Sequence, residues 1–158
     1  MKKSLSLLGG VAVLAFVAVP AVGQSSGKVA PKQVTRKTSP LVAHKYPWTY
    51  TTKGKVVLPK GDCPAGATDT TYCTPDVDKT KGCKGKVRVQ FLLGTKVISS
   101  KSKSVKKDCT YSSSVTFKDK TMAGKRLRVK ARFMGNSVLN AKDSAARRVL
   151  LARGASGL

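Results

Sequence analysis

From residue 46 onward, apolar and polar residues alternate in a series of short segments. In residues 126–133, Leu127, Val129 and Phe133 fall on one side, and the residues on the other side are all Lys or Arg. Strict alternation gives a β-strand one apolar and one polar face. The same period of two is found in residues 55–59, 83–94, 95–100, 109–117 and 147–152. Each of these segments is predicted to be a strand.

The predicted strands are separated by turns rich in Gly, Asp, Asn and Ser. This pattern is typical of antiparallel sandwiches and barrels, and no helical period follows the N-terminal segment. The folded region is predicted to span residues 46–153, beginning near Tyr46. Because a region of about 100 residues with six to seven strands has the size of an immunoglobulin-like domain, the predicted fold is an all-β, immunoglobulin-like antiparallel β-sandwich.

The first 23 residues have the features of a secretory signal. A pair of lysines precedes an apolar run from Leu5 to Val19, and the small residues Ala21 and Gly23 follow. We predict cleavage after Gly23 and export to the cell envelope or the extracellular space. An uncleaved membrane anchor is the alternative, but the apolar run is short for a bilayer span of roughly 20 residues.

The segments that flank the predicted domain lack any period. Residues 24–45 are rich in Ser, Pro and Lys and are predicted to form a disordered basic spacer. Residues 154–158 are predicted to be a flexible tail.

Positive charge dominates the composition. The chain carries 31 Lys and Arg residues against seven acids, all of them Asp, for a net charge of +24. Such a surface repels itself and attracts polyanions. Two interpretations remain open: the charge forms a binding surface, or it serves only the solubility of an inert spacer or protein-docking module.

Two of the predicted strands, residues 83–94 and 126–133, carry all of the candidate anion-binding residues. Same-face neighbours on a strand are about 6.5–7 Å apart, close to the spacing of phosphates along a nucleic-acid strand. An anionic cell-wall polymer, an acidic polysaccharide or a membrane surface is the expected partner. Sequence-specific reading of nucleic acid is disfavoured because Phe91 and Phe133 fall on the apolar faces, away from the charges. The candidates are Lys84, Lys86, Arg88, Arg126, Arg128, Lys130 and Arg132. In a sandwich we expect the two strands to lie in opposite sheets, which would give two separate basic faces.

Four cysteines in an exported chain suggest two disulfides, for which three pairings are possible. Cys63 and Cys73 enclose a short polar loop. If residues 84–103 form a hairpin, the chain returns to its starting end and brings Cys109 close to Cys83. We therefore favour Cys63–Cys73 with Cys83–Cys109. Zinc is disfavoured, because structural zinc sites usually contain cysteines two to four residues apart.

The residues after the strand at 126–133 carry a family resemblance. Gly135-Asn136, then Leu139, then Ser144 before the last strand are similar to the end of bacterial Ig-like repeat domains of secreted and surface proteins. The resemblance implies a spacer, an adhesin or an accessory binding module, and it implies no catalytic residues. An aromatic residue is commoner in the family at the position of Leu139, and this chain holds one copy.

Little in the sequence points to catalysis or to a cofactor. His44 is the only histidine and lies beside Lys45, away from any Ser or Cys motif. Asp76 and Asp78 resemble the start of a calcium loop, but no acid follows at the twelfth position. We expect no enzymatic activity, no cofactor and no metal, with a small secreted hydrolase as the least favoured alternative. The ligand and the oligomeric state are left undetermined.

Overall fold

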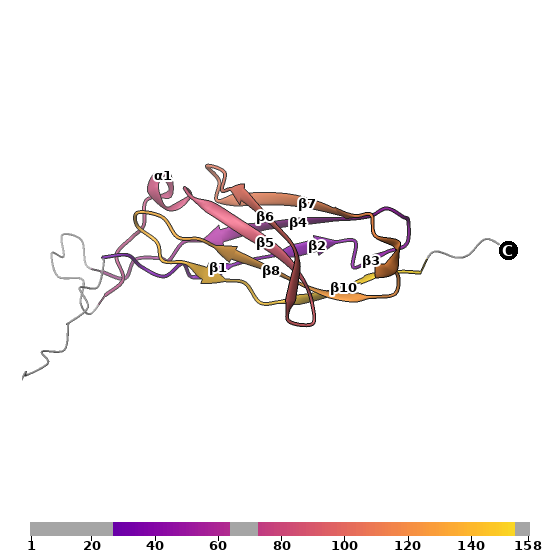
Figure 1. Ribbon diagram of the computed structural model, residues 1–158. Coiled ribbons are helices and arrows are strands. Elements are labelled where there is room, and N and C mark those ends of the chain that lie inside the picture. The colour runs from indigo at the N-terminus through magenta and orange to yellow at the C-terminus, as the bar shows by residue number, and fades with distance from the viewer. Residues whose placement is uncertain (1–26, 64–72, 154–158) are drawn as a thin grey trace, which may run out of the picture.

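The computed structural model describes residues 27–63 and 73–153, and these residues form two β-sheets packed face to face (Figure 1). We call the six-stranded sheet the large sheet and the four-stranded sheet the small sheet. Their strands run along the long axis of the molecule. The predicted signal at 1–23 and tail at 154–158 lie outside the described residues.

The large sheet has the strand order β3-β10-β8-β5-β6, and β9 pairs with β8. Its strands are antiparallel except for β3, which runs parallel to β10. The alternation expected for residues 126–133 is confirmed, since Leu127, Val129, Ala131 and Phe133 are fully buried. The strands are β3 (Val42–Ala43), β5 (Lys86–Leu93), β6 (Lys96–Ser104), β8 (Arg126–Phe133), β9 (Lys142–Asp143) and β10 (Arg147–Leu151).

The small sheet has β4 at its centre. β7 pairs with one edge of β4, and β1 and β2 pair with the other. Tyr50 and Tyr111 point inward from β4 and β7 and are buried, together with the hydroxyls of Thr52 and Thr38, which hydrogen bond to each other at 3.1 Å. The strands are β1 (Gln33–Val34), β2 (Lys37–Ser39), β4 (Trp48–Val57) and β7 (Thr110–Phe117).

Aromatic side chains join the two sheets at the core. Phe91 of the large sheet lies 5.8 Å from Tyr50 and 5.4 Å from Phe117 of the small sheet, measured between ring centroids. The Tyr50 hydroxyl also crosses to the large sheet and donates to the Leu150 carbonyl at 2.5 Å. The indole N–H of Trp48 donates to the Ala152 carbonyl at 3.1 Å. The sheets are therefore joined by apolar contacts in the middle and by hydrogen bonds at one end.

Residues 27–45, expected to be a disordered spacer, instead belong to the folded unit where they are described. They supply β1 and β2 to the small sheet and β3 to the large sheet. Val34, Thr38 and Ala43 are the buried residues of these strands. Because each strand is only two or three residues long, no repeat of period two develops, and the sequence pattern alone gives no signal.

The described part of the chain also contains a one-turn α-helix, α1 (Lys79–Gly82), and a 3₁₀ turn at Lys120–Met122. The expectation of no helix is wrong to this extent. The cysteines pair as favoured from the sequence, Cys63 with Cys73 and Cys83 with Cys109. Cys83 precedes β5 and Cys109 precedes β7, so the second disulfide links the two sheets. Two disulfides are consistent with an oxidising environment.

Candidate anion-binding surface

The two basic strands are neighbours in the large sheet, and the expectation that they lie in opposite sheets is wrong. β5 and β8 pair antiparallel, with Arg88 directly opposite Arg132 and Gln90 opposite Lys130. The chain crosses to the small sheet as β7 and returns as β8, which places it beside β5. The alternation within a strand fixes which side chains point outward, but it does not tell which strands pair.

We define the arginine face as the outward-facing cations of the large sheet. Sequence reasoning missed one of them, Arg148 on β10, which lies opposite Arg128. The inward positions Val149 and Leu151 could have indicated that Arg148 points outward. The members of the face are Lys86, Arg88, Arg126, Arg128, Lys130, Arg132 and Arg148. All are exposed except Lys130, which is partly buried.

Lys84 is the candidate that the structure leaves outside this face. It precedes β5, and Gly85 follows it with a φ of 108°, a left-handed conformation that interrupts the strand alternation. The Lys84 side chain is exposed, and its carbonyl accepts a hydrogen bond from Asn136. Lys84 is therefore a residue of the β5 entry turn.

The spacing of the arginine face suits an extended polymer. The four cations of β8 are each two residues apart and extend over about 20 Å, and the adjacent strands are about 4.8 Å away on either side. Arg128 also donates from Nη2 to the Gly94 carbonyl at 2.8 Å, which holds the β5–β6 turn against the sheet. Arginine offers a planar fork of donors, and this geometry matches carboxylate and phosphate oxygens two at a time.

The aspartates do not neutralise this face, because most of them hold turns. Of the six aspartates that the structure describes, five accept hydrogen bonds from backbone N–H groups. Three of these lie in Asp-x-Thr turns, in which the carboxylate accepts from both the N–H and the hydroxyl of the threonine two residues on. These hydrogen bonds lower the pKa of the carboxyls of Asp78, Asp108 and Asp119.

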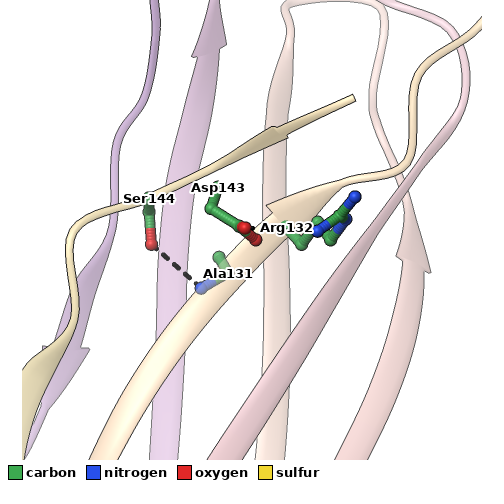
Figure 2. Close-up of polar contacts among 4 residues, drawn as sticks. All are labelled: Ala131, Arg132, Asp143 and Ser144. Carbon is green, nitrogen blue, oxygen red and sulfur yellow. Dashed lines mark hydrogen bonds and ion pairs between the residues drawn. The ribbon is translucent and has the colours of Figure 1, made fainter. Parts of the chain in front are cut away.

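The remaining described aspartate, Asp143, makes the one ion pair found within residues 27–63 and 73–153. Its Oδ2 lies 3.2 Å from Nη1 of Arg132, and both side chains are about half exposed (Figure 2). An exposed pair of this kind contributes roughly 0–1 kcal/mol. Next to it, the Ser144 hydroxyl accepts from the Ala131 N–H at 2.9 Å and fixes β9 against β8.

The turn that carries the family resemblance organises the end of the large sheet. Gly135 has a φ of 81°. The side-chain amide of Asn136 donates to the carbonyls of Lys81, Gly82 and Lys84 at 2.9–3.1 Å. Its Oδ1 accepts from the N–H groups of residues 138 and 139. Leu139 is fully buried beneath this turn. Asn136 therefore ties the exit of β8 to the entry of β5.

The other sequence candidates are less organised. His44 is exposed and borders a hollow of about 550 Å³ together with Pro40, Tyr46 and Thr49. Asp76 and Asp78, considered for calcium, accept hydrogen bonds from backbone N–H groups at 2.7 Å. Among the residues that the structure describes, no cluster of three or more His, Cys, Asp or Glu side chains has a geometry for holding a metal ion.

No protein-family model, curated protein or solved structure matches the chain. Helices long and apolar enough to cross a membrane are also absent from the described part of the chain.

Proposed function

We propose that this chain is an exported, non-enzymatic, immunoglobulin-like binding module whose arginine face holds anionic polymers of the cell envelope. The immunoglobulin-like assignment is supported by the order of the strands. β5 and β6 lie in one sheet, β7 lies in the other, and β8 and β10 return to the first. This exchange between sheets is the Greek-key connection typical of immunoglobulin-like sandwiches.

The observation that carries the binding proposal is the pairing of two basic strands on which, among the described residues, a single acid, Asp143, balances the cations. Arg88 and Arg132 are directly opposite each other, and like charges in that position destabilise a sheet by up to about 1 kcal/mol. A polyanion lying along β8 would neutralise this repulsion and would release its own bound counterions. The affinity of such a complex falls steeply with salt.

The test measures retention of the oxidised mature chain on immobilised heparin and on immobilised polyphosphate as a function of salt. We expect release by about 0.3 M salt. Replacing Arg126, Arg128, Lys130 and Arg132 by Ser lowers the salt needed for elution, and the slope of log affinity against log salt falls by roughly one for each lost contact.

A matched control removes the same charge elsewhere. Lys45, Lys60, Lys107 and Lys118 are exposed and lie outside the arginine face. Their replacement by Ser leaves most of the retention in place. If the two quadruple variants elute at the same salt concentration, net charge alone accounts for retention, and the proposed binding face is wrong. In that case the chain is a spacer or docking module whose charge serves its solubility.

A further inference from the structure

The outward face of the small sheet differs in composition from the arginine face. The outward-facing residues are all Ser, Thr or Lys from residue 49 to 55 on β4, along the whole length of β7, and on β2. We call this outward face the lysine–hydroxyl face. Its members are Lys37, Ser39, Thr49, Thr51, Lys53, Lys55, Thr110, Ser112, Ser114 and Thr116.

Part of this face is hollowed. A hollow of about 420 Å³ on the outward side of the paired strands β2 and β4 is lined by Lys37, Ser39, Thr51 and Lys53. Lys37 is directly opposite Lys53, and Ser39 is directly opposite Thr51. Directly opposite residues have Cβ atoms about 5 Å apart, and residues two apart on one strand are about 7 Å apart. The four side chains therefore stand at the corners of a small rectangle.

The donors of this hollow are unused within the described residues. Neither the two ammonium groups nor the Ser39 hydroxyl makes a hydrogen bond or ion pair there, and Thr51 shares only a 3.4 Å contact with the Ser114 hydroxyl. Two lysines facing each other without an acid repel, as the arginines do on the other sheet. The two ammonium groups can donate to several oxygens of a single anion, and the two hydroxyls lie next to them.

These observations favour a phosphate group over a carboxylate and over a long polymer. A carboxylate has two oxygens, whereas a phosphate ester offers three around one centre, and lysine acts on it as a point charge without the planar fork of arginine. The hydroxyls of Ser39, Thr51 and the neighbouring Ser114 both donate and accept, so they can also bind the hydroxyls of a sugar. The volume of the hollow is in the range of small-molecule sites.

We propose that the hollow formed by Lys37, Ser39, Thr51 and Lys53 is a binding site for a phosphorylated sugar. The two lysines hold the phosphate, and the hydroxyls of Ser39, Thr51 and Ser114 bind the sugar. This site lies on the opposite sheet from the arginine face and does not depend on polymer binding there.

The test titrates the oxidised mature chain with α-glucose 1-phosphate, glucose and inorganic phosphate at low salt, followed by backbone amide chemical shifts. We expect α-glucose 1-phosphate to shift the signals of residues 37–39 and 51–53, glucose to shift none, and inorganic phosphate to bind at least threefold more weakly than α-glucose 1-phosphate. Equal binding of inorganic phosphate would overturn the assignment of a sugar ligand.

Two variants test the residues themselves. Lys37→Gln combined with Lys53→Gln weakens binding of α-glucose 1-phosphate at least tenfold. Lys103→Gln combined with Lys107→Gln removes the same charge from exposed positions elsewhere and changes the affinity less than twofold. Ser39→Ala combined with Thr51→Val weakens α-glucose 1-phosphate but leaves inorganic phosphate nearly unchanged. Equal effects of the two lysine pairs, or shifts confined to β5 and β8, would refute the site.

Discussion

The arginine face and the lysine–hydroxyl face lie on opposite sides of one core and carry positive charge in different forms. On the large sheet, guanidinium groups stand in columns on neighbouring strands, with Arg88 opposite Arg132. On the small sheet, lysines are interspersed with serine and threonine, and Lys37 and Lys53 border a hollow. The same alternation of inward apolar and outward polar residues produces both faces.

On the two proposals above, the faces bind different kinds of ligand. Arginine forks on an extended sheet bind the oxygens of successive anionic groups along a chain. The paired lysines and the hydroxyls around the hollow of the small sheet would bind one phosphate and the polar groups next to it. Because both faces share one core, substitutions in the core affect both faces together. Substitutions at a turn or on the surface affect one face and leave the other unchanged.

Replacement of Phe91 by Ala is expected to have the largest effect and to disable both faces at once. Phe91 is fully buried on the large sheet and contacts Tyr50 and Phe117 of the small sheet. Truncation of a buried Phe costs about 3–5 kcal/mol. Urea unfolding measures this loss, and the folded amide signals of the arginine face and of the lysine–hydroxyl face should disappear at the same urea concentration. Val97→Ala, at an exposed position, is the control. Loss of one face well before the other would contradict a shared core.

Replacement of Asn136 by Ala is expected to weaken the large sheet selectively. The variant loses three donated hydrogen bonds that join the exit of β8 to the entry of β5. We expect a loss of about 2 kcal/mol, because carbonyls are left without a partner. Amide hydrogen exchange should accelerate at the adjoining ends of β5 and β8 and remain unchanged in β2. The neighbouring exposed Ser137→Ala serves as the control, and uniform acceleration across both sheets would argue against a local role.

Replacement of Tyr50 by Phe tests the hydrogen bond that joins the sheets at the opposite end. Loss of the donation to Leu150 is expected to cost about 1 kcal/mol. Burial raises the pKa of Tyr50 and of Tyr111 to about 12. Because the folded-state pKa of Tyr50 lies above the ordinary value of about 10, its neutral phenol contributes its full stability below about pH 10. This stability is lost as the pH rises toward 12.

The Tyr50 prediction has a pH readout that a packing defect would not produce. The stability of Tyr50→Phe should fall less steeply between pH 10 and 12 than that of the unmodified chain, and the double variant with Tyr111→Phe less steeply still. Tyr46→Phe, at an exposed phenol that donates to the Lys118 carbonyl, is the matched control. An unchanged slope in Tyr50→Phe would show that its phenol does not contribute to alkaline unfolding.

Sequence reasoning succeeded where a repeat was long enough to be read. Residues 126–133 contain four alternations, and all four inward residues are buried as predicted. The pairing of Cys83 with Cys109 followed from the return of the hairpin between them. Both inferences depend on local geometry, which the order of residues determines directly.

The predictions that failed depended on pairing between distant segments. β2 is three residues long and contributes Lys37 to the small sheet, yet the segment that contains it has no period, and its composition predicts a spacer. The pairing of β5 with β8 depends on the crossing of β7 to the other sheet, which alternation does not encode. Six members of the arginine face were therefore predicted singly, but Arg148 was missed and the face was not predicted as one surface. The lysine–hydroxyl face was not predicted.

The smallest expected effect is an increase in stability when one of two opposing arginines is neutralised. Arg88→Gln removes the repulsion from Arg132, which the exposed ion pair of Arg132 with Asp143 offsets only in part. It should raise the free energy of unfolding by about 0.2–1 kcal/mol at low salt. The gain should shrink at high ionic strength, because screening reduces the repulsion in the unmodified chain. Lys53→Gln should behave in the same way on the other face, since Lys53 is opposite Lys37.

Lys96→Gln is the control for this measurement, because Lys96 is opposite Leu93 and has no facing charge. Its substitution should change stability less than that of Arg88 or Lys53. A loss of stability in Arg88→Gln at low salt would mean that the two guanidinium groups do not repel each other across β5 and β8. The excess of cations on the large sheet would then give no reason to expect that a bound polyanion stabilises the fold. A gain in stability would mean that repulsion between the cations destabilises the fold and that a bound anionic ligand offsets this repulsion.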